Sequence, residues 1–323
     1  MILAGDIGGT NARLALFERS GKWVCRREQK FPSKQYAGLE EIIEEFVGAE
    51  TVSNACFGIA GPVRNGRCQA TNLPWVVDAE RLSRKLKIPR VHLLNDLEAN
   101  AYGISQLAPS ELALVHEGDL HQQGNRALIA AGTGLGEAGL YWNGSEHLPF
   151  ASEGGHSDFG PRNPLEVELL YYLEKKFGHV SYERVVSGPG LIEIYEFLIA
   201  TKRGERNPSL KEEMAKRNPS TVISEAGRLN TDETCVKALD WFLSLYGAES
   251  GNLALKYLSL GGFYIGGGIA PRLLEKLKEG AFHTSFVDKG RFKPLLSSIP
   301  IWVILNDQAA LLGAAFVARR EAP

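Results

Sequence analysis

The sequence Gly5-Asp6-Ile7-Gly8-Gly9-Thr10-Asn11 lies near the start of the chain, between two short apolar runs at residues 1–4 and 14–17. Its glycines allow backbone amides to converge on an anion, and Thr10 adds a hydroxyl donor. Asp6 can orient a hydrated Mg²⁺ beside such an anion. The same residues are also good turn formers, so a simple β-hairpin is an equally open interpretation of this stretch alone.

A second glycine-rich turn, Gly132-Thr133-Gly134-Leu135-Gly136, follows the apolar run at residues 128–131. It is not a Walker A loop, because no Gly-Lys-Ser/Thr follows, and it does not match the GxGxxG dinucleotide pattern. It does echo the first turn, since both stretches place glycine and threonine between two short predicted strands. This echo suggests two related domains that face one cleft.

The pair Asn95-Asp96 comes directly after the apolar run at residues 91–94. This position is the carboxyl end of a predicted strand, where ligands bind in α/β sheets. Asp96 is suited there to accept a proton from a substrate hydroxyl during phosphoryl transfer. A plain Asn-Asp cap on the following helix explains the same two residues, and both interpretations stay open.

The sequence Glu153-Gly154-Gly155-His156, together with Glu183 further on, combines carboxylates with an imidazole. Carboxylates accept bidentate hydrogen bonds from vicinal hydroxyls and an imidazole donates or accepts, so this set suits a polyol. A metal site is the rival interpretation for Glu153 and His156. It is disfavoured because no cysteine and no second histidine stands at ligand spacing.

A third glycine run, Gly266-Gly267-Gly268, follows the apolar residues 263–265 and precedes a helix expected from Pro271 to near Gly280. Such a run permits close approach of the backbone to a nucleotide at a helix N-terminus. As a bare connection between a strand and a helix it would mean little.

The alternation of short apolar runs with longer helical patterns indicates an α/β protein. One helix has a clear start and stop, because Asn163 can cap it, Pro164 suits its first position, Glu166 stands at the capping-box position and Gly178 ends it. Residues 202–220 are charged and contain two Asn-Pro-Ser triplets, which predicts surface structure without chemistry. Residues 309–318 predict a C-terminal helix packed on a sheet. The runs read as strands are residues 1–4, 14–17, 55–60, 91–94, 127–131, 263–265 and 301–305.

Composition narrows the class of protein. The chain has 323 residues, 44% of them apolar, and a formal net charge of −2, so it can bury one large core or two medium ones. Balanced charge argues against a nucleic-acid partner or an anionic membrane surface. The four cysteines are far apart in sequence, which suggests free thiols in a reducing compartment. With neither a signal peptide after Met1 nor a run of about 20 apolar residues, we expect a cytoplasmic protein without a membrane partner.

Taken in order, these five stretches resemble the hexokinase, Hsp70 and actin superfamily, which has two phosphate motifs, a catalytic acid region between them and a late adenosine motif. Within it the chain is similar to bacterial glucokinases of the zinc-free branch. The related ROK branch carries zinc-binding cysteines after its histidine motif, whereas here no cysteine follows His156 before Cys235. The matching motifs are residues 5–13, Thr71-Asn72-Leu73-Pro74-Trp75, Leu94-Asn95-Asp96, residues 132–136, Glu153-Gly154-Gly155-His156, Glu183-Arg184 and Ser187-Gly188-Pro189-Gly190.

The resemblance implies a two-domain, actin-like ATPase (ribonuclease H-like) α/β fold with a cleft between the domains. By this analogy residues 1–106 plus 308–323 form the small domain and residues 107–307 the large one. It also implies ATP-dependent phosphorylation of glucose at the 6-hydroxyl, giving glucose 6-phosphate for glycolysis, by a cytoplasmic homodimer. A kinase for mannose, fructose or an N-acetylhexosamine is the alternative enzyme, and a non-catalytic sugar sensor is the alternative from another class.

The resemblance assigns roles to individual residues. It implies that Asp96 is the general base, that Asn95, Glu153, His156 and Glu183 hold the other sugar hydroxyls, and that Asp6 holds Mg²⁺ through water. The residues it implies for ATP are Gly5, Asp6, Ile7, Gly8, Gly9, Thr10, Gly132, Thr133 and Gly134, with adenosine near Gly266, Gly267 and Gly268.

Overall fold

The computed structural model describes residues 1–18, 24–71 and 73–320, so Asn72 of the sequence motif lies outside the described part. The chain divides into two compact units. The first comprises residues 1–111, 148–151 and 306–323, and the second comprises residues 112–147 and 152–305.

The first unit is built on a five-stranded sheet in the order β3-β2-β1-β4-β8. The strands β1, β4 and β8 run parallel, whereas β2 and β3 are antiparallel neighbours that continue the sheet from β1. A small three-stranded sheet, β5-β6-β7, accompanies it. The strands are β1 (Ile2–Ile7), β2 (Asn11–Glu18), β3 (Val24–Pro32), β4 (Asn54–Ile59), β5 (Val63–Arg64), β6 (Arg67–Gln69), β7 (Val76–Asp78) and β8 (Arg90–Asn95).

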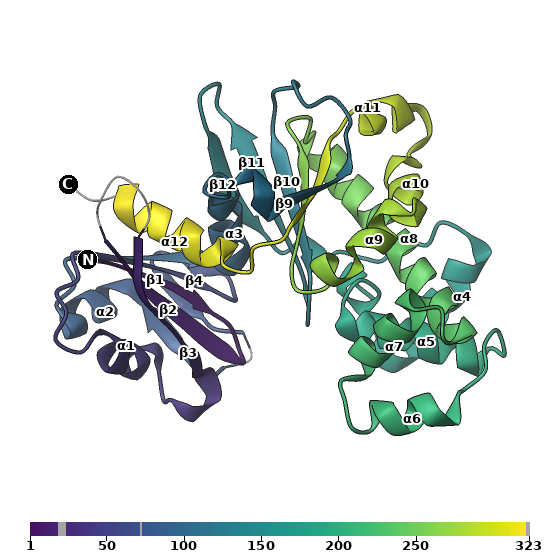
Figure 1. The fold of residues 1–323 in the computed structure, drawn as a ribbon, viewed down its shortest axis with the longest axis horizontal. Helices are drawn as coiled ribbons and strands as arrows, with labels where there is room; N and C mark the ends of the chain where they lie inside the picture. Colours follow the sequence, from purple (N-terminus) through teal and green to yellow (C-terminus); the bar gives the residue numbers. More distant parts are fainter. Residues whose placement is uncertain (19–23, 72, 321–323) are drawn as a thin grey trace. The chain divides into compact units, whose positions relative to one another are not determined.

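Helices cover both faces of this sheet, as Figure 1 shows. Side chains of a strand alternate between the two faces, so Leu3 and Ile7 pack with α1 and α2, whereas Ile2 and Ala4 pack with α12. The C-terminal helix expected from its alanines and leucines is therefore confirmed. The helices of the unit are α1 (Leu39–Val47), α2 (Ala79–Leu86), α3 (Asp96–Ile104) and α12 (Ala309–Arg320), with 3₁₀ turns η1 (Ser33–Gln35) and η2 (Pro109–Glu111).

The second unit is built on a six-stranded sheet in the order β12-β11-β10-β13-β14-β9. Its strand β10 has an antiparallel neighbour, β11, on one side and the parallel strands β13 and β14 on the other. This arrangement repeats that of β2, β1, β4 and β8, so the two sheets are related as the echo between the glycine turns predicted. The strands are β9 (Leu112–His116), β10 (Arg126–Ala131), β11 (Leu135–Trp142), β12 (His147–Ser152), β13 (Phe263–Gly266) and β14 (Ile301–Ile304).

The long helix α8 (Glu233–Tyr257) is the centre of the second unit. Its side chains Leu239, Phe242 and Tyr246 are buried in the large hydrophobic core between the sheet and the other helices. The remaining helices are α4 (Pro164–Phe177), α5 (Gly188–Ala200), α6 (Pro208–Met214), α7 (Pro219–Arg228), α9 (Leu274–Lys278), α10 (Ala281–Val287) and α11 (Lys293–Ser297), with 3₁₀ turns η3 (Gly154–His156), η4 (Tyr182–Arg184), η5 (Ala270–Leu273) and η6 (Gly290–Phe292).

Every run that was predicted to be a strand is a strand, with ends that differ by a few residues. The helix after Asn163 is also confirmed, because the Asn163 side chain accepts a hydrogen bond from the Glu166 N–H and Gly178 ends α4. The capping box itself is altered, since the Glu166 carboxylate accepts from the N–H of Arg162 at 2.7 Å. The helix expected from Pro271 begins as the 3₁₀ turn η5 and ends with α9 at Lys278.

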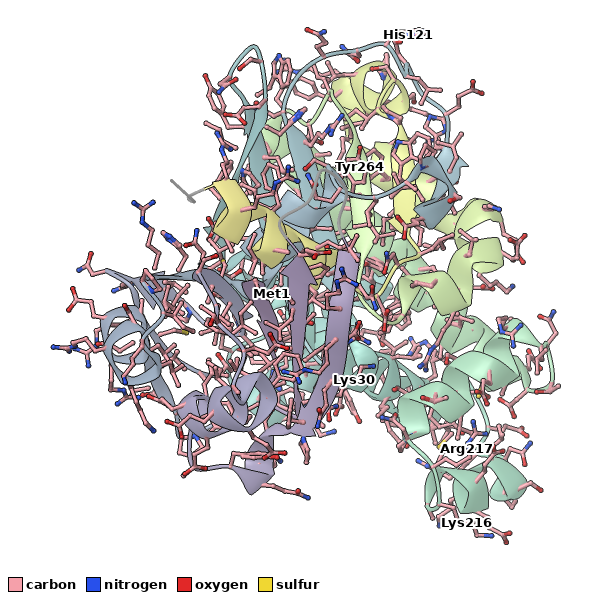
Figure 2. All side chains as sticks on the ribbon, turned by 60° about the vertical axis from the view of Figure 1, so that its left-hand side comes forward. Met1, Lys30, His121, Lys216, Arg217 and Tyr264 are labelled. Carbon is pink, nitrogen blue, oxygen red and sulfur yellow. The ribbon has the colours of Figure 1, made fainter. Side chains whose placement is uncertain are left out.

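The strand β3 was not predicted, because its charged residues hide the apolar alternation of a strand. All but one of its side chains are exposed, as expected for charged residues at the edge of a sheet. Lys30, labelled in Figure 2, lies on this strand.

The four cysteines are free, as predicted. No helix in the described part of the chain has the length and apolar character needed to cross a membrane.

We predict that Gly313→Ala destabilises the first unit, because α12 and α3 touch at this glycine. A Cβ at Gly313 would lie 1.8 Å from the carbonyl oxygen of Ala99 in α3. Separating the two helices should lower the free energy of unfolding by about 2 kcal/mol. Thermal unfolding measures this loss, with Gly160→Ala as the control, since its Cβ would meet only the Tyr182 hydroxyl at 3.5 Å. Equal melting temperatures for the two variants would contradict the prediction.

Candidate active site

Three parallel strands of the first unit end in register at one edge of the sheet. Ile7 of β1 pairs with Ile59 of β4, and Ile59 pairs with Asn95 of β8. The glycine turn after β1 and the start of α3 therefore lie at the same edge, with β4 between them. This edge is where α/β sheets bind their ligands.

Gly58 in β4 permits the close packing at this edge. A Cβ at Gly58 would lie 2.7 Å from the Cβ of Ala99, 3.7 Å from the Cα of Asp96 and 3.8 Å from the carbonyl oxygen of Gly5. Any side chain here would push α3 away from the strand. Sequence reasoning missed Gly58, although a glycine inside an otherwise apolar strand is a known sign of close backbone approach.

The turn between β1 and β2 is a hairpin, and it also leaves donors free. Gly8 N–H donates to the Asn11 carbonyl at 2.9 Å, and the Ser33 hydroxyl and N–H donate to the carbonyls of Gly8 and Thr10. The N–H groups of Gly9 and Thr10 donate to none of the described residues. The hairpin interpretation is therefore confirmed. Phosphate binding stays a prediction, which the hairpin allows because its free amides can receive an anion.

Asp6 lies opposite Arg13 in the β1–β2 pair. The Arg13 guanidinium is already occupied, because it donates to the Asp307 carboxylate at 2.8 Å and pairs with Glu28 at 3.2 Å. The Asp6 carboxylate accepts no hydrogen bond from the described residues. Burial raises the pKa of its carboxyl above the ordinary value, and the charge of Arg13 opposes that shift. A partly buried carboxylate without a donor suits a hydrated cation.

Asp307 is a residue of this edge that sequence reasoning missed. It follows β14 and directly precedes α12, and it is held by Arg13 through both its carboxylate and its carbonyl. The signal was present, since Asn306-Asp307 follows an apolar strand in the same way as Asn95-Asp96.

Asn95 and Asp96 join β8 to α3, and the helix-cap interpretation is correct for Asn95. Its Oδ1 accepts from the N–H groups of Leu97 and Glu98, and its Nδ2 donates to the Gly61 carbonyl at 3.2 Å. Asp96 is the first residue of α3, and its Oδ1 accepts from Leu97 N–H at 2.9 Å. The cap fixes the backbone that carries the Asp96 carboxylate, so the cap and a catalytic role are compatible.

In the second unit, Glu183 contacts the second glycine turn. The Leu135 N–H donates to its Oε2 at 3.0 Å, and the Gly188 N–H donates to the Gly132 carbonyl at 2.8 Å. The structure thus brings Glu183 to the turn at residues 132–135, which the sequence did not indicate. Its other oxygen accepts no hydrogen bond from the described residues.

Glu153 and His156 lie at the two ends of a single turn. The His156 N–H donates to the Glu153 carbonyl at 3.0 Å, and this closes the 3₁₀ turn η3. Both side chains are exposed, and neither makes a side-chain hydrogen bond within the described part of the chain. The two exposed side chains therefore flank one turn and are available to a polar ligand, and their role in binding stays a prediction.

A pocket with a volume of about 330 Å³ lies beside the second glycine turn, within the second unit. Of the predicted cofactor residues, Gly132, Thr133 and Gly268 line it, whereas Gly134, Gly266 and Gly267 do not. Gly266 instead ends β13. The rest of the lining is Gly188, Pro189, Leu191, Ile192, Asn218, Pro219, Ser220, Thr221, Ser224, Ile269, Arg272 and Leu273.

Residues 202–220 were expected to be surface structure without chemistry, and the second Asn-Pro-Ser triplet among them lies at the wall of this pocket. Asn218 caps α7 by accepting from the N–H and hydroxyl of Ser220, and this triplet lines the pocket. The neighbouring Lys216 and Arg217 project from the outside of the α6–α7 connection (Figure 2). The sequence indicated only the end of a helix here, because the triplet, Gly132 and Gly268 come together at the pocket only in the folded chain.

Each unit thus holds its own set of polar groups. The first has free amides, a carboxylate suited to a cation and a second carboxylate at a strand end. The second has a carboxylate and imidazole pair that suits a polyol, and a pocket beside a glycine turn. These are the groups that phosphoryl transfer to a hydroxyl requires.

Comparisons with known proteins agree with this set of groups. The model of the glucokinase family matches residues 3–321. A glucokinase of Nostoc sp. is 41% identical over 339 residues, covering 99% of each chain. The crystal structure of glucokinase from an Antarctic psychrotroph has a TM-score of 0.84 at 30% identity, covering 99% of each chain. A ROK family glucokinase from Streptomyces griseus, solved in complex with glucose and AMPPNP, shares the fold with a TM-score of 0.66 at 20% identity, again covering 99% of each.

We predict that Gly58→Ala lowers the melting temperature and that Gly58→Ala combined with Ala99→Gly restores part of it. The added methyl group overlaps the Ala99 Cβ at 2.7 Å, and the second change removes that Cβ. The single overlap should cost about 2 kcal/mol, and Ala99→Gly alone about 1 kcal/mol of helix stability. A double-mutant cycle of unfolding free energies measures the coupling. Simple additivity of the two losses would contradict the proposed contact.

Proposed function

The chain belongs to the glucokinase family, and on this basis we propose that it transfers the γ-phosphoryl group of ATP to the 6-hydroxyl of glucose. The products are glucose 6-phosphate and ADP. The observation that carries the proposal is the common sheet edge in the first unit, where the turn with free amides and Asp96 follow parallel strands in register. A phosphate-binding turn and a base are needed together for this transfer.

Asp96 is the proposed general base. It accepts the proton of the 6-hydroxyl as the hydroxyl oxygen attacks the γ-phosphorus. Its place as the first residue of α3, directly after the Asn95 cap, supports this role, because the Asn95 side chain ties the first turn of α3 to the Gly61 carbonyl. The Asn95 amide retains one N–H for a neighbouring sugar hydroxyl.

Glu153, His156 and Glu183 are proposed to hold the other hydroxyls. The exposed side chains at the two ends of η3 support this, and so does the Glu183 oxygen that the Leu135 N–H leaves unused. Since carboxylates accept from two adjacent hydroxyls, such a set distinguishes hexoses by the orientation of each hydroxyl.

The phosphates of ATP are proposed to bind the amides of Gly9 and Thr10 and the turn of Gly132, Thr133 and Gly134. The adenosine is proposed to occupy the pocket beside Gly132, with Gly268 at its wall. The volume of about 330 Å³ and the mixed polar and apolar lining support a nucleoside there.

Mg²⁺ is proposed to be held by Asp6 through water. The described residues contain no group of three or more carboxylate, histidine or cysteine side chains that would hold a metal on their own. A single carboxylate fits Mg²⁺, which keeps several waters and takes further ligands from substrate phosphates. When bound, the ion neutralises charge that develops on the transferred phosphoryl group.

We further propose that the protein acts in the cytoplasm as a homodimer and feeds glycolysis. Light scattering after size-exclusion chromatography tests the dimer, which should have twice the chain mass.

Comparing kcat/KM for glucose, mannose, fructose and N-acetylglucosamine tests which sugar is the substrate, and glucose should give the highest value. Calorimetric binding of glucose without any phosphate transfer from ATP would instead indicate a sugar sensor.

Asp96→Asn should reduce kcat by about 10³-fold or more while glucose still binds, because the shape is kept and the base is lost. A coupled assay measures kcat, and calorimetry measures glucose binding. Asp240→Asn on α8 is the control, since it makes the same chemical change on an exposed helix surface. Turnover close to that of the parent protein would exclude Asp96 as the base.

Gly268→Val should raise the KM for ATP about tenfold or more and leave the KM for glucose unchanged. A Cβ at Gly268 meets no atom within 4 Å, so the side chain enters the pocket without straining the fold. A loss of about 1.4 kcal/mol in binding is a tenfold change. Steady-state kinetics with each substrate varied in turn checks this. A rise in the KM for glucose alone would contradict the placement of the nucleotide.

A further inference from the structure

Two glutamates are buried together in the second unit, and the mechanism above does not use them. Glu137 on β11 is 1% exposed and Glu249 on α8 is fully buried. The Glu249 carboxyl group is close enough for its charge to raise the pKa of Glu137, and neither oxygen of Glu137 has a hydrogen-bond partner among the described residues. Two buried carboxylates repel strongly, so one of them retains a proton.

One ammonium group, that of Lys256, pairs directly with the buried carboxyl groups. On α8, the Lys256 ammonium lies 3.4 Å from Glu249 Oε1, and the Asn252 amide donates to Glu249 Oε2 at 2.8 Å. After α10, Lys289 donates to Asn252 Oδ1 at 2.6 Å. Burial and the nearby Glu249 raise the pKa of Glu137 to about 8, against the smaller opposing effect of Lys256.

None of the other titratable groups that face the pair places a positive charge next to Glu137. Arg162, before α4, is held by Glu166 at 2.6 Å. Tyr182 in η4 and Tyr246 on α8 are neutral, because burial raises the pKa of each phenol above its ordinary value. Glu137 is therefore the member of the pair with the least compensation for a charge.

Glu137 lies directly beneath the turn that carries Glu153 and His156. A Cβ at Gly154 would lie only 2.0 Å from Glu137 Oε2, so the carboxyl group is in contact with the backbone of η3. The same turn is held from its other side, where the Gly154 N–H donates to the Ser152 hydroxyl at 2.9 Å. A change in the charge or position of Glu137 therefore acts on this turn first.

The pair is also connected to the two other functional turns of the unit. The Asn252 amide donates both to Glu249 and, at 3.0 Å, to the hydroxyl of Tyr182, which precedes Glu183 in η4. The Ala131 N–H, one residue before Gly132, donates to the Tyr246 hydroxyl at 3.2 Å, and Tyr246 faces Glu137. Three turns with proposed roles in binding thus rest on one buried polar cluster.

We propose that Glu137 and Glu249 share one proton and that the singly charged pair positions the η3 turn for glucose. The inference rests on the proposed function, because it assigns glucose to Glu153 and His156. When the shared proton is lost to solvent at alkaline pH, a second negative charge forms beneath Gly154. The turn must then move away or admit water, and glucose binds less tightly.

Glu137→Gln tests the inference, since the amide keeps the shape and donates a hydrogen bond to Glu249 in place of the shared proton. The KM of the parent protein for glucose should rise about tenfold between pH 7 and pH 9, because the deprotonated form dominates at pH 9. The KM of Glu137→Gln should stay within about twofold of its value at pH 7. The kcat profiles of the two proteins should be parallel, which separates positioning from catalysis.

Glu233→Gln is the matched control, because it makes the same change at an exposed position of α8, where the Glu233 side chain is 82% exposed. Its KM should follow the parent protein across the pH range. A Glu137→Gln profile that rises in parallel with the parent profile would overturn the inference. Glu249→Gln applies the same test from the other carboxyl group if the first variant does not fold.

Unfolding tests the shared proton without any activity. The pKa of Glu137 is raised in the folded state above the value of about 4.5 in the unfolded state, so the parent protein loses stability as pH rises between these values. Between pH 5.5 and pH 8 the melting temperature of the parent protein should therefore fall by about 5 °C relative to that of Glu137→Gln. A constant difference would overturn the shared proton.

The failure of the inference and the failure of the proposed function give different results. Calorimetric titration of glucose without ATP gives a Kd at each pH, so positioning can be measured even in a chain that transfers no phosphate. A pH-dependent Kd that Glu137→Gln abolishes supports the inference, with or without turnover. Normal turnover with the same pH dependence of Kd in both proteins refutes the inference and leaves the proposed function intact.

Discussion

The parallel register of β1, β4 and β8 is the constraint on which the first unit depends. Because Ile7, Ile59 and Asn95 are level, the three strands end together, and the segments that follow them emerge side by side. Gly58 makes the arrangement narrow enough for Asp96 to begin its helix close to the β1 turn. The second sheet repeats the same order around β10, so a glycine turn again follows the strand that has a parallel neighbour. One topology, used twice, thus places a glycine turn after the equivalent strand of each sheet.

Charge explains why backbone amides, rather than an arginine, are the anion donors proposed for the first unit. The chain carries a net charge of only −2, and its most buried arginine in the first unit, Arg13, already serves Asp307 and Glu28. A guanidinium held by two carboxylates has little capacity left for a phosphate. The free N–H groups of Gly9 and Thr10 supply the positive potential instead, and Asp6 is left without a donor. Such a carboxylate is stabilised by a cation that arrives with its ligand.

Most of the architecture could be predicted because it depends on residues that are neighbours in sequence. Features that depend on tertiary contacts could not be predicted. Asn163, Pro164 and Gly178 predicted α4 because caps are decided by neighbours in sequence. The strand β3 was not predicted, because an exposed edge strand needs no apolar face and so shows no apolar alternation in the sequence. The place of Asn218 at the pocket was missed for a different reason. Its role as a helix cap depends on neighbouring residues, but only folding brings it to the pocket with Gly132 and Gly268. The roles of Asp96, Glu153, His156 and Glu183 came from the resemblance, and they stay predictions.

The glutamates of the second unit show why residue type alone could not assign these roles. Glu153 and Glu137 have the same side chain, and both adjoin the η3 turn. The exposed Glu153 stays hydrated and accepts hydroxyl donors, whereas Glu137 has lost its water and faces another carboxyl group. Desolvation and the nearby like charge therefore favour the protonated form of Glu137. In the proposal, this protonated side chain supports the backbone of Gly154. In the proposed arrangement, glucose binding by Glu153 and the protonation of Glu137 are coupled through Gly154, because the Glu137 carboxyl group contacts the backbone there directly.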